Sequence, residues 1–96
     1  MKDYRFYLEY PNKKEKNKAT RKNLGDHSGT CLAVFGDPFS KDDNIFYECV
    51  AALFDKHDSE AMTTSCSWGY LRHSCKRVSA HTARQIHPKL FKYLEQ

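Results

Sequence analysis

The sequence lacks the long apolar segments that would mark a membrane protein. None of its hydrophobic runs approaches the roughly 20 residues that a membrane-spanning helix needs. Residues 1–5 are also not followed by the apolar core of a secretion signal. These absences lead us to expect a soluble cytoplasmic protein with no membrane partner.

Catalytic motifs are missing as well. The chain has four glycines, and they form no phosphate-binding loop, dinucleotide-binding pattern or nucleophile elbow. Neighbouring carboxylates occur at Asp42 and Asp43 and at Asp55 and Asp58, but their surroundings are typical of solvated turns. A Cys–His pair could assemble across space, yet no local signature indicates one. We therefore expect a protein that is not an enzyme and binds no cofactor.

Close cysteine pairs are absent too. Cys31, Cys49, Cys66 and Cys75 are scattered along the chain, whereas zinc ligands usually come in pairs about two to five residues apart. A zinc site would use Cys66, His73 and Cys75, but their spacing does not suit one. We therefore expect no metal, and reduced thiols that are mostly buried as small apolar groups.

A chain of 96 residues is enough for a single small domain with a modest core. Its first strand is predicted at residues 4–10, where side chains alternate and aromatic residues are frequent. Tyr4, Phe6 and Leu8 should face the core, and the intervening set, which includes Tyr7, should face solvent. Pro11 ends the strand because it has no amide hydrogen for the ladder.

Two further strands are predicted. Residues 30–35 are a short apolar run between turn residues and indicate a buried central strand. Residues 45–54 fit either a strand or a helix, and their aromatic and β-branched content favours the strand. The polar segment 11–29 predicts a basic loop or an extended hairpin. Residues 61–65 could form another strand or a loop.

The segment 65–78 contains the only tryptophan and predicts an amphipathic helix. A rotation of about 100° per residue places its apolar residues in one arc and its basic residues on the opposite side. Ser67 is a natural N-cap, whereas Gly69 disfavours the helix by about 1 kcal/mol relative to alanine. The apolar arc consists of Trp68, Leu71, Cys75 and Val78.

After Ser79, a second capping residue, apolar side chains recur at helical spacing until Pro88 interrupts them. The pattern predicts two short helices, Ala80–Ile86 and Pro88–Leu94, or one kinked helix. The expected fold is an α+β domain, a three-stranded antiparallel sheet with two or three short carboxyl-terminal helices packed on one face. Those helices would contact the sheet through Trp68, Leu71, Ile86, Leu90, Phe91 and Leu94.

Charge is unevenly distributed along the chain, although the net charge is only +4. Residues 11–24 and 61–96 are basic, and residues 36–60 are acidic. A polarised surface of this kind can steer a charged partner toward the protein.

Nucleic acid is the partner class that this pattern favours. A lysine-rich loop offers point charges for phosphates, whose neutralisation supplies most non-specific affinity. Basic residues of the segment 65–78 could add a more rigid ridge, and exposed tyrosines such as Tyr7 could stack on bases. The candidate contact residues are Lys13, Lys14, Lys16, Lys18, Arg21, Lys22, Arg72, Lys76, Arg77 and Arg84.

The alternative is a protein-interaction module that acts as an inhibitor or adaptor by occluding a charged surface of another protein. Its acidic central segment would suit a basic partner, and its lysine-rich loop an acidic one. A virus or mobile element could encode such a protein. On sequence alone, DNA, RNA and protein remain open as targets, as does the oligomeric state.

Overall fold

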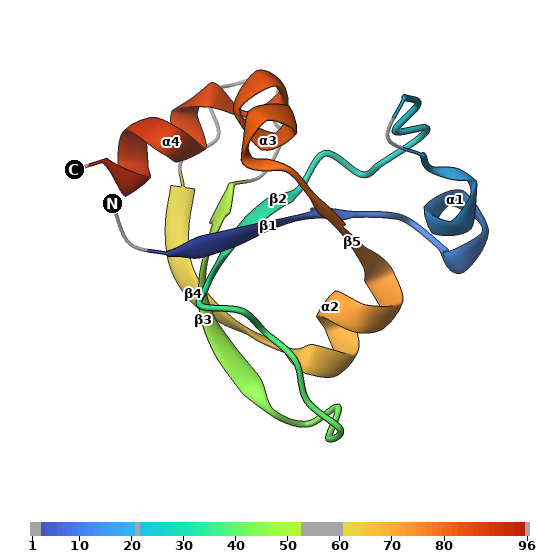
Figure 1. Cartoon of the computed structure of the whole chain (residues 1–96), viewed down its shortest axis with the longest axis horizontal. Coiled ribbons are helices and arrows are strands. Elements are labelled where there is room, and N and C mark those ends of the chain that lie inside the picture. Colours follow the sequence, from blue (N-terminus) through green and yellow to red (C-terminus); the bar gives the residue numbers. More distant parts are fainter. Residues whose placement is uncertain (1–2, 21, 53–60, 96) are drawn as a thin grey trace.

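A computed structural model describes residues 3–20, 22–52 and 61–95 of the chain. They form a five-stranded antiparallel sheet with helices on both faces (Figure 1). The strands are β1 (Tyr4–Glu9), β2 (Cys31–Phe35), β3 (Phe46–Ala52), β4 (Ala61–Ser67) and β5 (Cys75–Val78). The helices are α1 (Lys13–Lys18), α2 (Trp68–Ser74), α3 (Ala80–Ile86) and α4 (Pro88–Leu94).

The predicted α+β class is confirmed, but the predicted three-stranded sheet is wrong because the sheet has five strands. The three expected strands all form, and α3 and α4 have the expected bounds. The segment 45–54, where helix and strand competed, is a strand from Phe46 to Ala52. Residues 53 and 54 lie outside the described residues.

The helix predicted over residues 65–78 is a second correction. It ends at Ser74, and Cys75–Val78 form β5, which pairs with β1. Cys75 and Val78 are three residues apart, which suits one face of a helix, but in the strand they pack on opposite faces of the sheet. The edge of β1 decides between helix and strand, because its backbone amides and carbonyls need partners. Ser67 does cap α2, since its hydroxyl accepts a hydrogen bond from the amide of Tyr70 at 3.1 Å.

The strand order is β4-β3-β2-β1-β5, a four-stranded meander with the fifth strand added beside the first. Helix α2 follows β4 and precedes β5 without a loop, so it joins the two edges of the sheet. A seven-residue helix is about 10 Å long, whereas the edges of a flat five-stranded sheet lie about 19 Å apart. The sheet must therefore curve around α2, as Figure 1 shows.

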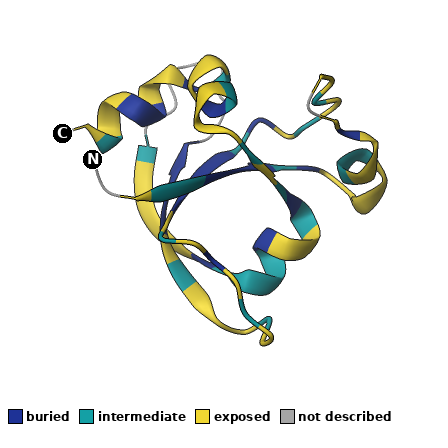
Figure 2. Ribbon diagram, viewed as in Figure 1, coloured by how far each residue is buried: buried dark blue, intermediate teal, exposed yellow. Residues whose placement is uncertain are grey.

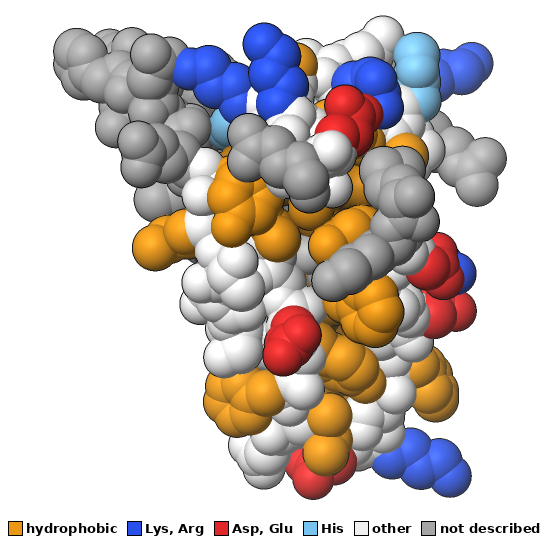
Figure 3. Space-filling model, turned by 90° about the vertical axis from the view of Figure 1, so that its left-hand side faces the viewer, with side chains coloured by type: hydrophobic (Ala, Val, Ile, Leu, Met, Phe, Trp, Pro, Cys, Tyr) orange, Lys and Arg blue, Asp and Glu red, His pale blue; other side chains and the backbone are white. Residues whose placement is uncertain are grey.

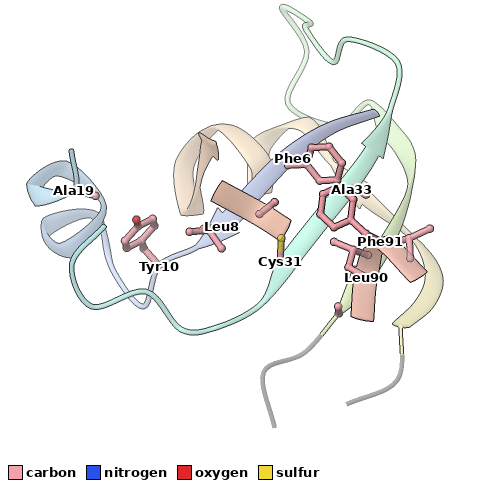
Figure 4. Close-up of a cluster of buried hydrophobic side chains, with 11 residues drawn as sticks. Phe6, Leu8, Tyr10, Ala19, Cys31, Ala33, Leu90 and Phe91 are labelled. Atoms are coloured by element: carbon pink, nitrogen blue, oxygen red, sulfur yellow. The ribbon is translucent and has the colours of Figure 1, made fainter. Parts of the chain in front are cut away.

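Each face of the sheet carries its own core, because successive side chains of a strand point to opposite faces. On one face, α3 and α4 pack on a cluster that includes Phe6, Leu8, Leu90 and Phe91 (Figure 4). The rings of Phe6 and Phe91 stack with centroids 4.9 Å apart. On the other face, α2 packs on a second cluster formed by Tyr7, Leu32, Val34, Cys49, Ala51, Cys66, Leu71 and Cys75.

The helices therefore do not all pack on one face, as the sequence predicted. Trp68 and Leu71 pack on the α2 face, and the expected contacts of α3 and α4 lie on the other. Tyr7 is only 5% exposed, because α2 covers the face that its polar neighbours led us to assign to solvent. Figure 2 shows buried residues along the strands between the helices, with most of α1 and most of β4 exposed. The expected contacts that lie on the α3–α4 face are Ile86, Leu90, Phe91 and Leu94.

The four cysteines are buried, and no disulfide joins them. Burial raises the pKa of Cys31 and of Cys75 to about 12. These thiols therefore stay protonated at neutral pH and behave as small apolar side chains, as expected for cysteines without a reactive environment.

Candidate nucleic-acid interface

Residues 13–18 form a helix, α1, within the segment expected to be a loop or hairpin. Asn12 caps the helix by accepting a hydrogen bond from the amide of Glu15 at 2.8 Å. None of its six residues is buried, and so short a helix is not stable alone in water. The strand end before it is anchored, since the amide of Tyr10 donates to the carbonyl of Ser74 at 2.8 Å. The helix therefore depends on contacts with the rest of the fold.

Two lysine side chains hold α1 against α2 and β5. The Nζ of Lys16 donates to the carbonyl of Arg72, and the Nζ of Lys76 donates to the carbonyl of Ala19. These partners are 56 and 57 residues apart in the sequence. Ala19 is itself buried in the core cluster beside Tyr10 (Figure 4). The lysine-rich segment and the basic part of residues 65–78 thus form one surface.

A hollow of about 580 Å³ opens where α1, α2 and β5 meet the loop after β2. This volume is within the range of small-molecule sites. Cations and aromatic rings line it side by side, so the hollow offers a ligand both positive charge and aromatic surface. The cations are Lys16, Arg72, Lys76 and Arg77, the aromatic residues are Tyr7, Phe39 and Trp68, and one carboxylate, Asp37, also lines the hollow.

Phe39 stands beside this hollow on a fixed backbone. It is 76% exposed, more than any other large apolar residue in the described part of the chain. The hydroxyl of Tyr47 accepts from the amide of Phe39 at 3.2 Å and donates to its carbonyl at 3.0 Å. The ring centroids of Phe39 and Trp68 lie 6.2 Å apart, with a 57° angle between the ring planes. The backbone of Phe39 is therefore anchored, and its exposed ring lies next to the half-buried ring of Trp68.

The loop that carries Phe39 docks onto the first turn of α2. The amide of Trp68 donates to the carbonyl of Ile45 at 2.7 Å, and the amide of Gly69 donates to the carbonyl of Asp43 at 2.9 Å. A Cβ atom on Gly69 would lie 3.0 Å from the Cβ of Asp43 and 3.1 Å from its carbonyl oxygen. The glycine that disfavours the helix is thus the residue that lets the loop approach it.

Two carboxylates offset part of the positive charge. Asp37 pairs with Arg77 at 3.1 Å and with Arg5 at 3.8 Å, and Asp43 pairs with Arg72 at 3.3 Å. All these side chains are partly exposed, and ion pairs of this kind contribute little to stability. Both arginines of the hollow can therefore exchange a carboxylate for a phosphate at small cost.

Electrostatics at the base of the hollow also favour an anion. Burial lowers the pKa of Lys16, and the nearby positive charges of Lys13, Lys76 and Arg72 lower it further. A bound anion would offset this mutual repulsion.

Not every predicted contact residue lines the hollow. Arg84 lies in α3 on the opposite face of the sheet, where it pairs with Glu95 at 3.4 Å. Its guanidinium carbon stands 4.6 Å from the ring centre of Phe91. Arg21 lies outside the described residues. The remaining candidates are exposed on or after α1, namely Lys13, Lys14, Lys18 and Lys22.

A second hollow, of about 600 Å³, lies between β5, the start of α3 and the loop after α1. Lys76 and Arg77 line both hollows. The hydroxyl-bearing residues Thr20, Ser79 and Thr82 line only the second. The two hollows are therefore neighbours across β5, with two cations between them.

Sequence reasoning missed the aromatic and acidic parts of this surface. Phe39 is a lone aromatic residue in a polar loop, and that isolation was the only available signal. Asp37 and Asp43 resemble solvated turn residues in the sequence. Tyr7, which we expected to be exposed enough to stack on bases, is buried and contributes only to the floor of the hollow.

Metal ligands, membrane-spanning helices and known relatives were also sought. Within residues 3–20, 22–52 and 61–95, no group of three or more His, Cys, Asp or Glu side chains is arranged to hold a metal ion. No helix in those ranges is long and apolar enough to cross a membrane. Comparisons with family models, curated proteins and solved structures find no match.

Proposed function

We propose that this is a small non-catalytic nucleic-acid-binding or regulatory protein, which contacts phosphates through α1 and the basic residues of α2 and β5. The observation that carries the proposal is the convergence of Lys16, Arg72, Lys76 and Arg77 around one hollow. Four cations outnumber the two carboxylates that pair with this group. Guanidinium groups also match phosphate oxygens well, because they can form two parallel hydrogen bonds.

Salt dependence tests the proposal. Binding of labelled DNA and RNA should weaken as salt is raised, which can be followed by fluorescence anisotropy. The log–log slope should be roughly −0.9 per phosphate contacted on a duplex and roughly −0.7 on a single strand. If neither nucleic acid binds even in dilute buffer, the proposal is wrong.

A matched pair of double variants locates the binding surface. Arg72→Gln with Arg77→Gln removes two charges from the hollow, so affinity should fall and the slope should become shallower by roughly 0.7–0.9 per lost contact. Arg84→Gln with Lys92→Gln removes the same charge from α3 and α4 and should change affinity little. Equal losses in the two variants would mean that net charge, and not the hollow, governs binding.

A second candidate function, a protein-interaction module, has separate support in an apolar face. Phe35 and Phe46 are exposed at the ends of β2 and β3 and, by strand alternation, share the face of the sheet that carries Ala33 and Val50. The neighbouring strand β4 carries no charged residue. Figure 3 shows hydrophobic side chains gathered along one face of the molecule. Contiguous apolar patches often mark protein interfaces.

The test of this second candidate is a pull-down from nuclease-treated native lysate with the wild-type protein and with Phe46→Ser. A partner that the wild type retains and the variant loses would support it. Loss of every partner on nuclease treatment would instead support nucleic acid.

A further inference from the structure

We infer that the nucleic acid bound here is single-stranded, with an unstacked base against Phe39 and Trp68 and its phosphates on the cations beside them. The inference rests on the proposed function, because it names the form of nucleic acid that the same hollow takes. It depends on how the aromatic rings are held, where the charges lie relative to them, and how the two hollows adjoin.

The aromatic part of the hollow has the properties of a stacking platform. A single exposed phenylalanine is ordinary on a protein surface. Phe39 differs because Tyr47 fixes its backbone on both sides and its ring lies 6.2 Å from that of Trp68. Because the backbone of Phe39 is already fixed, only its side-chain rotamer has to be ordered when a base stacks on the ring. Stacking of this kind tolerates any base, since every base has a π-face.

The charges lie where a phosphate next to a stacked base would be. Lys16, Arg72 and Lys76 line the same hollow as the two rings. In a nucleotide, base and phosphate are joined through one sugar, so both can be bound at once in a hollow of this composition. In a duplex, each base face is covered by its neighbours, and a ring reaches it only if the base is flipped out. The arrangement therefore favours a strand whose bases are already free.

The second hollow extends the path beyond one nucleotide. Lys76 and Arg77 line both hollows, so a strand that leaves the first passes two cations before it enters the second. There, Thr20, Ser79 and Thr82 offer hydroxyl groups, which commonly bond phosphate and sugar oxygens. A strand of several nucleotides fits this path better than a mononucleotide does.

Trp68 provides the readout, because it is the only tryptophan in the chain. Three probes about ten nucleotides long, within the usual site size, separate the outcomes: oligo-dT, the same backbone with abasic sites, and a duplex. Oligo-dT should quench Trp68 fluorescence and bind about 5- to 140-fold more tightly than the abasic strand, which reflects the stacking of one base. The abasic strand should bind through its phosphates without quenching.

Phe39→Ala is the decisive variant. It should lower the affinity for oligo-dT to that for the abasic strand and leave the abasic affinity unchanged. Phe46→Ala is the matched control, because Phe46 is also exposed, at 66%, but does not line either hollow. Both side chains are too exposed to be needed for folding, which circular dichroism can verify.

The results that would overturn the inference differ from those that would overturn the proposed function. If oligo-dT, abasic strand and duplex bind alike, or if Phe39→Ala keeps the preference for oligo-dT, the base site is wrong and phosphate binding stands. If none of the three probes binds in dilute buffer, the proposed function itself is wrong.

Discussion

The two faces of the sheet are covered by helices in different ways. On the α3–α4 face, hydrocarbon and aromatic groups such as Phe6, Leu90 and Phe91 close the core. On the α2 face, three cysteines and a tyrosine join the core, and polar atoms lie at its margin. There the hydroxyl of Tyr70 donates to Glu9, whose other oxygen accepts from Ser28 at 2.8 Å. On the α2 face, the buried cluster itself supplies part of the lining of the first hollow.

The core of the α2 face and the first hollow share residues. Tyr7, Leu71 and Cys75 belong to the buried cluster and also line the hollow. Helix α2 is short, so its ends lie close to the rim of the core, where half-buried Trp68 meets the loop that carries Phe39. A change at Leu71 should therefore reach the ligand, whereas a change at Leu90, which lines neither hollow, should not.

The strongest test compares two buried leucines, one on each face. Leu90 and Leu71 are both fully buried, so replacing either with alanine should lower the free energy of unfolding by about 2–5 kcal/mol. Urea unfolding measures this loss. Only Leu71→Ala should also weaken binding of oligo-dT, because only Leu71 lines the hollow. Equal effects on binding would show that the two faces are not functionally distinct.

Alkaline pH should destabilise both faces through buried thiols, of which Cys31 and Cys75 are one on each face. Cys31 lies in the α3–α4 cluster and Cys75 in the α2 cluster, and burial raises the pKa of each from 9.0 to about 12. The unfolded chain then loses these protons first. Stability is therefore complete below pH 9 and falls above it by about 1.4 kcal/mol per pH unit for each thiol.

Urea denaturation at a series of pH values between 9.0 and about 12 measures how the free energy of unfolding changes with pH. Cys31→Ala and Cys75→Ala should each make the slope shallower by about 1.4 kcal/mol per pH unit. Some dependence on pH should remain in both variants, because the hydrogen bond to Cys49 and burial raise the pKa of Cys66. Burial also raises the pKa values of Tyr7, Tyr10 and Tyr70. A slope that neither variant changes would contradict the assigned cause.

The fold was predictable from the sequence wherever a local pattern determines the element. The strands β1, β2 and β3 have clear alternation or apolar runs, and α3 and α4 have a serine cap, helical spacing and a proline between them. The strand β4 has a weak pattern, since most of its residues are small and polar. The strand β5 and the helix α1 depend on distant partners, which are the edge of β1 for one and Arg72 for the other.

The sequence identified the charged residues of the candidate site, but it did not predict which of them meet in the fold. Lysines and arginines stand out by residue type, and their role as phosphate contacts stays a prediction. Their meeting depends on a crossing connection that brings Lys16 to Arg72, which no local pattern encodes. Phe39 acquires its position only through the hydroxyl of Tyr47 and the docking of its loop on α2.

Gly69→Ala tests the contact between that loop and α2. Alanine favours the helix by about 1 kcal/mol, but its Cβ would crowd Asp43 at 3.0 Å, and such overpacking costs about 1–3 kcal/mol. We expect a net loss of up to about 2 kcal/mol in urea unfolding and weaker quenching of Trp68 by oligo-dT. A gain in stability would mean that the loop moves aside without cost, and Phe39 would then not be held as the structure indicates.

The smallest effect is expected from replacing two exposed carboxylates, each of which pairs with an arginine on its own face of the sheet. Asp43 lies 3.3 Å from Arg72 beside the hollow, and Glu95 lies 3.4 Å from Arg84 in the α3–α4 layer. Asp43→Asn and Glu95→Gln should each change stability by less than about 1 kcal/mol, because exposed pairs contribute little. Asp43→Asn should raise the affinity for oligo-dT by up to about 5-fold, since a unit charge about 4 Å away contributes about 1 kcal/mol in water. Glu95→Gln should leave it unchanged. Weaker binding by Asp43→Asn would show that this carboxylate positions Arg72 for the phosphate and does not compete with it.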